Sequence, residues 1–514
     1  MTFQILDALI MTPIAAALIV ALVPNRRSEL HLPLGIALSM IPLALAGWLF
    51  FAFEKGVAGY QFVHESPWYE PWGMSWHVGV DGISLALIAL TALLVPISLA
   101  ASTAITDRTK LFVVFMLILE AGLIGVFVAL DLILFFLFFE VVLVPMYFII
   151  GVWGGERRIY AAYKFFIYTA LGSALMLAGI IALAFFHRDQ AGALSFGYEQ
   201  LLNLELTDTA QLWLFGAFGL AFAIKVPIFP LHTWLPDAHV EAPTAGSVML
   251  AGVLLKLGTY GFIRFNLGLF PDATIELIPV MATLAVIGII YGAYVAIVQP
   301  DLKKLVAYSS VSHLGFIVLG TFALTQAAVE GAVIQMVNHG ITTGVLFLMV
   351  GMLYERRHTK KIADFGGIWQ VAPWFSGVFL FTAFASIGLP GLNGFVGEFM
   401  VLMGSYATLP VAAIFGAFGV VLAAIYLLWA YERVFTGPIT NEENRNVADL
   451  NAREVSLLAP LVALMLVIGL YPNIILDRLT PSVEAVLDRI EVTTTYEVPE
   501  PGPLSEVLGG GHGD

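Results

Sequence analysis

Ionisable side chains inside long apolar segments are the residues of this 514-residue sequence best suited to do chemistry. Lys225 closes the apolar stretch AFAIK, and Lys256 lies near the middle of LAGVLLKLGTYG. Glu140 stands within LFFLFFEVVLVPMYF. A charged group at the centre of a bilayer costs at least about 2.5 kcal/mol, so such residues are rare and usually mark ion or proton paths. Their positions therefore predict an ion path through a membrane.

The two residue types in this path could act on each other's charge. Burial disfavours the charged form of a carboxylate or an ammonium, and a nearby opposite charge favours it. A buried lysine can therefore gain and lose its proton as a carboxylate approaches and withdraws. A static salt bridge is the alternative reading of Glu140. For Lys164 the alternative is a side chain that reaches the membrane surface, but the apolar flanks of Lys256 make that reading poor there.

Two histidines in polar surroundings are candidates for a proton relay. His313 lies in VAYSSVSHLGFIVLG and His339 in VIQMVNHGITTGVL. Histidine titrates near neutral pH and can pass protons between water molecules. Either one alone could equally be a hydrogen-bonded core histidine. Nearby hydroxyl and amide side chains favour a hydrated relay, and they are Ser309, Ser310, Ser312, Asn338, Thr342 and Thr343.

Further carboxylates extend the candidate path. Glu398 follows the interruption in GLPGLNGFVGEFMVL, whereas Lys225 precedes the break expected at Pro227. Glu120, in LILEAGLIG, is a secondary candidate. A polar strip, expected to line a turn and the way into the path, holds His232, Asp237, His239 and Glu241. These four lack convincing ligand spacing, so we expect no metal site.

Composition defines the elements that must hold these residues. The sequence is 60% hydrophobic and 12% charged, with a mean hydropathy of +0.91, which is typical of a helical protein with many membrane spans. It contains no cysteine, which excludes disulfides, cysteine-bound iron–sulfur clusters and thiol catalysis on this chain. The net charge of −14 argues against nucleic acid as a partner. No nucleotide, haem or flavin motif occurs, so we expect no redox site or cofactor on this chain.

Apolar runs of about twenty residues recur along the chain and predict membrane spans. We count fourteen, near 3–23, 31–52, 82–102, 110–129, 131–152, 163–186, 210–230, 243–268, 275–298, 302–321, 328–353, 373–406, 408–431 and 456–473. We expect residues 1–23 to be a retained first span, because a basic start and a clear cleavage site are missing. Residues 54–80 are expected to form an external loop rich in aromatic residues, and residues 474–492 an amphipathic or interfacial helix.

Lysine and arginine are distributed unevenly between the two predicted faces. Loops after odd-numbered spans hold fifteen of them. Loops after even-numbered spans, with the tail, hold five, namely Lys55, Arg188, Arg264, Arg478 and Arg489. By the positive-inside rule the odd-numbered loops face the cytoplasm, and both termini lie outside.

Two blocks of the sequence resemble each other at an offset near 170 residues. LDLILFFLFFEVVLVPMYFIIG (130–151) resembles PDLKKLVAYSSVSHLGFIVLG (300–320), and AFAIKVPIFPL (221–231) resembles AFASIGLPGLN (383–393). Units with an odd number of spans sit inverted relative to each other, and inverted repeats with broken helices are a recurring transporter architecture. We therefore predict an all-α membrane fold with two inverted five-helix repeats, broken in spans 7 and 12. Chance similarity of apolar segments is the alternative.

The predicted organisation has four parts. Residues 1–109 hold the first three spans and the external loop, 110–270 the first repeat, 271–432 the second repeat, and 433–514 the last span and an acidic tail. An inverted repeat would place Lys225 and Glu398 at comparable depths in opposite halves, with Lys256 and the histidines between them.

The stretch FPLHTWLPDAHVEAPTAGSVMLAGVLLKLGTYG (229–261) resembles the signature of the proton-pumping membrane subunits of respiratory NADH:quinone oxidoreductase, complex I. Those subunits are themselves similar to subunits of multi-subunit cation/proton antiporters. The variant with AHVEAP and LLK is most similar to the M type. The similarity extends from about Val80 to the 430s.

The resemblance implies a role for each candidate residue. Glu140 and Lys225 would form the switching pair, and Lys256 would be the central proton carrier. His313 and His339 would be the relay, and Glu398 the exit-side carboxylate. Glu120 and His232 would be secondary.

The resemblance also implies a setting. Partners would be the other membrane and peripheral subunits of the complex, with related antiporter-like subunits on either side, in a bacterial inner membrane. NADH, FMN, iron–sulfur clusters and quinone are expected in those partners. One alternative is a subunit of a sodium/proton antiporter without redox coupling. Another is a passive scaffold whose buried charges only hold helices together, which five or more aligned ionisable groups disfavour.

Overall fold

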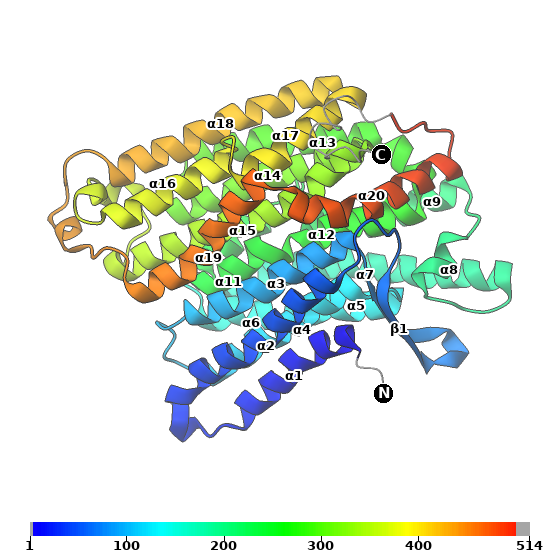
Figure 1. Ribbon diagram of the computed structural model, residues 1–514, viewed down its shortest axis with the longest axis horizontal. Coiled ribbons are helices and arrows are strands. Elements are labelled where there is room, and N and C mark those ends of the chain that lie inside the picture. Colours follow the sequence, from blue (N-terminus) through cyan, green and yellow to red (C-terminus); the bar gives the residue numbers. More distant parts are fainter. Residues whose placement is uncertain (1–3, 500–514) are drawn as a thin grey trace.

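The computed structural model describes residues 4–499, and helices dominate it (Figure 1). The helices are α1 (Ile5–Leu22), α2 (His31–Ala52), α3 (Gly82–Ala100), α4 (Thr109–Val128), α5 (Leu132–Val141), α6 (Leu143–Trp153), α7 (Arg158–Ala191), α8 (Tyr198–Leu202), α9 (Asp208–Lys225), α10 (Trp234–Glu241), α11 (Thr244–Met249), α12 (Lys256–Gly261), α13 (Pro271–Ile297), α14 (Leu302–Phe322), α15 (Gln326–Arg357), α16 (Pro373–Ile387), α17 (Asn393–Thr408), α18 (Pro410–Phe435), α19 (Ala452–Leu470) and α20 (Asn473–Thr493). Shorter helical pieces used below are η1 (Asn25–Leu30), η3 (Leu250–Leu254) and η4 (Phe262–Leu267). The strands are β1 (Gln61–Tyr69) and β2 (Met74–Val80).

Twelve helical segments within residues 4–499 are long and apolar enough to cross a membrane. The predicted fourteen spans also require α9, which carries Lys225, and the pair α16 and α17, which are each too short to cross alone. The chain is therefore a polytopic helical membrane protein. The count of fourteen stays a prediction.

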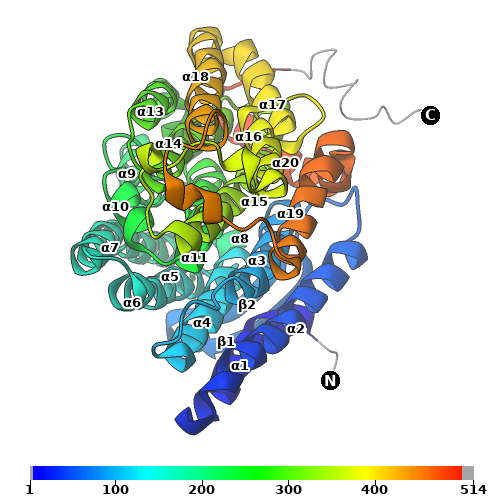
Figure 2. The same cartoon turned by 90° about the vertical axis from the view of Figure 1, so that its left-hand side faces the viewer.

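The long helices run side by side, with the most buried ones at the centre (Figure 1). Almost every residue of α14 and α15 is buried by its neighbours. Figure 2 shows α1, α2, α7 and α18 at the periphery of the bundle. These outer helices expose large apolar side chains, including Leu18, Leu171 and Val421. Apolar outer faces are expected where lipid replaces water around a helix.

Two helices are interrupted where the sequence predicts breaks. α9 ends at Lys225, and after the turns at 226–233 the chain continues as α10. α16 ends at Ile387, and Gly388 adopts a left-handed conformation with φ 85° before α17 begins. Glycine tolerates this conformation because it lacks a Cβ. Both predicted interruptions are therefore present.

The segment between α2 and α3 differs from the predicted loop. Residues 61–80 form an antiparallel hairpin of β1 and β2, with Gly73 in the left-handed region at its turn. The indole of Trp76 donates to Asp7 in α1 over 2.7 Å, so the hairpin lies against the start of the first helix. The predicted amphipathic segment 474–492 is the helix α20.

Connections assigned to one face by the sequence do lie together at one end of the bundle, on the left in Figure 1. Lys110, in the first turn of α4, donates to the carbonyl of Ala21 at the end of α1. The backbone N–H of Leu302 donates to the backbone carbonyl of Lys360 over 2.8 Å. This hydrogen bond joins the α13–α14 and α15–α16 connections. We refer to this end as the basic end. Two residues counted as loop cations belong elsewhere: Lys303 is buried in the first turn of α14, and Arg264 is buried in η4.

The two blocks of the predicted repeat share a local structure. Asp131 and Asp301 each cap a helix, accepting from the N–H of Leu134 (3.0 Å) and Lys304 (2.9 Å) respectively. Each aspartate also forms an isolated bridge to a later segment, Asp131 with Gly197 and Asp301 with Lys361. These parallels agree with the repeat. The inverted arrangement and the four-part division stay predictions.

Candidate functional site

Lys256 lies fully buried where the helical pattern changes. In η3 the N–H of Leu255 donates to Leu250, five residues back, so the carbonyl of Ala251 loses its usual partner. The ammonium of Lys256 donates to this freed carbonyl. Single π-helical turns of this kind are frequent at functional sites. The sequence predicted a smooth span here, because a π-turn has no composition of its own.

Lys256 begins a series of contacts between ionisable side chains. Its Nζ lies 2.7 Å from Nδ1 of His339 on α15. The rings of His339 and His313, on α14, have centroids 5.8 Å apart. Nδ1 of His313 lies 2.7 Å from Oε1 of Glu398 on α17. We call Lys256, His339, His313 and Glu398 the central series, and all four are at most 3% exposed.

Neutral polar groups hold the far end of the central series. Gln335 donates to Oε1 of Glu398 over 3.1 Å. Nε2 of His313 lies 3.1 Å from the hydroxyl of Tyr426 and 3.4 Å from that of Ser386. These groups fix the orientation of the imidazole, which decides which nitrogen can exchange a proton. Oε2 of Glu398 is buried without a hydrogen-bond partner within residues 4–499, so one lone pair is free to accept a proton.

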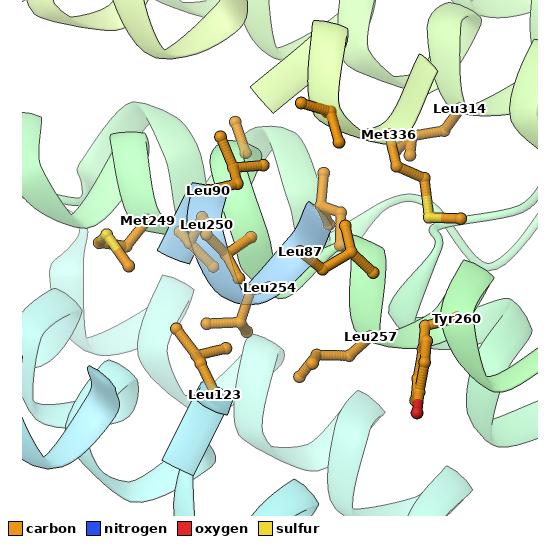
Figure 3. Packing of buried hydrophobic residues seen from close by; sticks show 14 of the residues in the cluster. Leu87, Leu90, Leu123, Met249, Leu250, Leu254, Leu257, Tyr260, Leu314 and Met336 are labelled. Atoms are coloured by element: carbon orange, nitrogen blue, oxygen red, sulfur yellow. The ribbon is translucent and has the colours of Figure 1, made fainter. Parts of the chain in front are cut away.

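Apolar side chains surround the Lys256 end of the central series. Figure 3 shows Leu87 and Leu90 packed beside Met249, Leu250 and Leu254, around the helix turns that lead into Lys256. In these surroundings an unpaired polar group is costly, so a proton moves most easily between groups that already touch. Within this apolar packing, the side chain of Lys256 contacts the imidazole of His339.

The predicted switching pair is not in contact. Glu140 and Lys225 form no ion pair, although Glu140 is close enough to act on the lysine electrostatically. The ammonium of Lys225 instead lies 4.5 Å from the centre of the Phe139 ring and 6.0 Å from that of Phe165. Such cation–π contacts stabilise a desolvated ammonium by about 2 kcal/mol. Glu140 is half-buried, and its Oε1 has no hydrogen-bond partner in the described chain.

Backbone carbonyls beside the two helix breaks accept hydrogen bonds from side chains of other segments. The indole of Trp234 donates to the carbonyl of Ile224 over 2.9 Å. The amide of Asn338, on α15, donates to the carbonyl of Asn393 over 2.6 Å. Buried backbone groups need such partners. Trp234 and Asn338 thus support the breaks beside Lys225 and Glu398.

Residues of the polar strip lie toward the basic end, as the predicted turn requires. Asp237 pairs with Lys164 at 2.8 Å, so Lys164 is held by a carboxylate and does not merely reach the surface. His232 is buried and stacks on Phe229, with ring centroids 5.6 Å apart. Glu241 accepts from the N–H of Arg157 over 3.0 Å. None of these three joins the central series.

His239 and Lys303 are buried ionisable residues on the side of Lys256 that faces the basic end, and the sequence pattern does not reveal the burial of Lys303. His239 is buried, stacks on Phe347 at 4.7 Å, and interacts electrostatically with both Lys256 and Lys303. Both of its ring nitrogens lack a hydrogen-bond partner among residues 4–499. Lys303 donates to the carbonyl of Ala242 over 2.5 Å. Lys303 lies two residues after Asp301, the residue that caps α14, and this position is the feature of the sequence that could have indicated its burial.

Two other buried groups lie outside the series. Glu120 on α4 is fully buried, and within the described chain neither carboxylate oxygen has a hydrogen-bond partner. At the opposite end from the basic end, Arg264 pairs with Asp81 at 2.5 Å and donates to Tyr60 over 2.9 Å. The sequence alone does not indicate the pair of Arg264 and Asp81. No group of three or more His, Asp or Glu residues suited to a metal ion occurs within residues 4–499.

Comparison with known proteins identifies relatives for nearly the whole chain. Residues 129–425 match the family model "NADH:quinone oxidoreductase/Mrp antiporter, TM". Residues 33–126 match "NADH-ubiquinone oxidoreductase chain 4, amino terminus". The chain is 42% identical over 494 residues to NADH-quinone oxidoreductase subunit M of Rhodobacter capsulatus, covering 93% of this chain and 96% of that one. It is also 42% identical over 480 residues to NADH-ubiquinone oxidoreductase chain 4 of Marchantia polymorpha, covering 93% and 96%.

Solved structures also match this chain over most of its length. A chain of respiratory complex I from Thermus thermophilus with bound NADH superposes with a TM-score of 0.85 at 32% identity, covering 94% of this chain and 99% of that one. A chain of the Mrp complex from Dietzia sp. DQ12-45-1b has a TM-score of 0.81 at 19% identity, covering 96% and 99%, which shows a shared fold alone. The two family matches together span most of the chain. This chain belongs to the NADH:quinone oxidoreductase/Mrp antiporter family, in the group of subunit M and chain 4.

Proposed function

We propose that this chain translocates protons across a membrane as a subunit of an NADH:quinone oxidoreductase, using the central series as its proton path. The observation that carries the proposal is the contact of four buried ionisable groups: Lys256 with His339, and His313 with Glu398, at 2.7 Å each. Each group can hold or release a proton.

The chemistry assigns a role to each residue. Lys256 is the central carrier, because its ammonium touches both a freed carbonyl and an imidazole. His339 and His313 pass the proton on, and Glu398 is the exit-side carboxylate. Glu140 and Lys225 are the switch, closed when the carboxylate reaches the ammonium and open in the arrangement of this structure. His239 and Lys303 supply protons from the basic end, with His232 and Glu120 secondary.

The proposed setting follows from the family. Electron transfer from NADH to quinone takes place in partner subunits, which hold FMN and iron–sulfur clusters, and related antiporter-like subunits lie on either side. The basic end faces the cytoplasm of a bacterium, and both termini lie on the outer side of the inner membrane.

The test is proton pumping by the intact complex reconstituted in vesicles. His313→Gln keeps a hydrogen-bonding side chain that cannot be protonated, so we expect fewer protons pumped per NADH oxidised. His187→Gln, which changes an imidazole bonded only to the nearby Ala193 carbonyl, should pump like the parent. Pumping by His313→Gln equal to that of the parent, at equal assembly, would remove His313 from the path.

Redox coupling is separated from antiport in the same vesicles. An NADH:quinone oxidoreductase subunit should co-purify with NADH-oxidising, iron–sulfur subunits and acidify vesicles only when NADH is oxidised. A sodium gradient that moves protons without NADH would instead support the antiporter alternative.

A further inference from the structure

A pocket of about 540 Å³ opens at the basic end, away from the central series. It lies between η1, the start of α2 and the start of α4, and its polar wall holds Asn25, Ser28, His31, Arg108, Thr109 and Lys110. Figure 2 shows α1, α2 and α4 together at the edge of the bundle. We call this cavity the η1 pocket.

The η1 pocket is positively charged. Arg108 and Lys110 line it, and Arg26 and Arg27 are exposed in the adjoining η1. Two acids lie in the same connections, Glu29 in η1 and Asp107, whose carboxylate is 85% exposed and 3.8 Å from Arg108. Four cations against two acids leave an excess of positive charge that the described residues do not neutralise.

Hydrogen-bond donors face the same cavity. His31 lines it and is only 2% exposed, and its Nε2 makes a long 3.4 Å contact with the carbonyl of Val23. The 20-residue helix α4 begins at the pocket, and its N-cap residue, Arg108, provides no side-chain cap. Free N–H groups at a helix start add to the attraction for an anion.

The apolar part of the wall indicates a lipid rather than a soluble anion. Leu111 and Val114 of α4 line the pocket, and Leu111 is 41% exposed. On the adjacent α1, Leu18 and Leu22 are 61% and 82% exposed and lead away from the pocket along the outer surface. A phosphodiester in the pocket would place its acyl chains against these residues. Basic pockets between membrane helices on the cytoplasmic side favour anionic head groups in this way.

We propose that the η1 pocket binds the head group of an anionic phospholipid, with Arg108 and Lys110 contacting the phosphate. The same phosphate chemistry is carried by free inorganic phosphate, and the apolar wall is what favours the lipid. A zwitterionic phospholipid binds less well, because its own cation faces the arginines.

The test uses the intact complex, mildly delipidated in detergent. Phosphatidylglycerol, phosphatidylcholine and inorganic phosphate are added separately, and retained phosphatidylglycerol and the thermal midpoint are measured. In the parent, phosphatidylglycerol alone should raise the midpoint. The double variant Arg108→Gln/Lys110→Gln should lose this shift and retain at least one phosphatidylglycerol fewer per complex. Arg188→Gln, an exposed cation outside the basic end, is the matched control and should behave like the parent.

A second variant covers failure of the double variant to assemble. Asn25→Asp adds a negative charge to the pocket while keeping both cations, and it should also lose the shift. Parent-like lipid retention in both variants would overturn the proposal. An equal shift with phosphate alone would show a free-anion site and overturn the lipid assignment, and a shift with phosphatidylcholine would remove the charge argument.

Discussion

The ammonium of Lys225 faces the Phe139 ring, 4.5 Å from its centre, although Glu140 is the next residue along the chain. The two neighbours occupy different sides of α5: Phe139 is buried against the lysine, whereas Glu140 is half-buried. Contact between Glu140 and Lys225 therefore requires these side chains, or α5 itself, to move. The interruption at Val142, between α5 and α6, provides a place for movement of α5.

Lys225→Ala should nearly abolish proton pumping while the complex still assembles. Without Lys225, Glu140 has no ammonium with which to pair, and the Phe139 ring keeps the surroundings apolar. Pumping is measured with a pH-sensitive dye in vesicles, alongside the amount of assembled complex. Lys55→Ala, which removes an ammonium that is 50% exposed, should leave pumping unchanged. Normal pumping by Lys225→Ala at normal assembly would rule out the switching pair.

Lys256→Met should also stop pumping, and it tests the central series directly. Methionine is similar in length to lysine but cannot carry a proton. The relay step therefore loses its acid–base group, which typically contributes a factor of about 10²–10⁴ to the rate. The carbonyl of Ala251 and Nδ1 of His339 lose their shared donor, which costs about 1–3 kcal/mol of stability. A lowered thermal midpoint with normal pumping would make Lys256 a structural residue.

The sequence allowed much of this site to be predicted, and the exceptions have physical causes. Lys225, Lys256 and Glu398 stood out because charge is costly inside an apolar run, and Pro227 and Gly388 marked the breaks because their backbone chemistry is distinctive. The π-helical turn before Lys256 has no such marker. Periodicity within one helix also does not show which side chain of a neighbouring helix lies closest.

Lys303 and Arg264 are buried cations whose burial the sequence pattern does not reveal. Both flank predicted span ends, where a lysine or arginine is usually solvated, and the charge count treated them as loop residues. Segments distant in the sequence bury both residues. Lys303 donates to the carbonyl of Ala242, and Arg264 forms an ion pair with Asp81. Such contacts depend on the packing of the whole bundle.

Arg356→Ala should destabilise the complex without changing the proton path. Arg356 donates to both carboxylate oxygens of Glu454, at 2.8 and 2.7 Å, and joins α15 to α19. The Glu454 side chain is only 3% exposed, so removing its cation costs about 3–5 kcal/mol. Arg445→Ala breaks an exposed pair, which water screens, and should destabilise the complex far less. Thermal midpoints are compared at equal pumping per assembled complex, and similar midpoints for the two variants would contradict the buried pair.

The orientation is tested by labelling single cysteines, which is straightforward because the chain has none of its own. Lys361 is exposed at the basic end, and Arg188 is exposed near the end of α7. An impermeant thiol reagent should label Lys361→Cys only from the cytoplasmic side and Arg188→Cys only from the outer side. Labelling of both from one side would mean that the predicted number of spans is wrong.

Glu398→Gln should cut pumping strongly, because the amide keeps the shape of the carboxylate but cannot carry a proton. Its contact with Nδ1 of His313 and the bond from Gln335 place this carboxylate at the end of the central series. Glu398→Asp keeps the acid on a shorter side chain and should lose less. Glu120→Gln, in a buried site without a contact to the series, should lose less than Glu398→Gln. All three are measured as protons pumped per NADH at equal assembly. If Glu398→Gln pumps like the parent, the proton leaves His313 by another route, and the hydroxyl of Tyr426, 3.1 Å from Nε2, becomes the group to test.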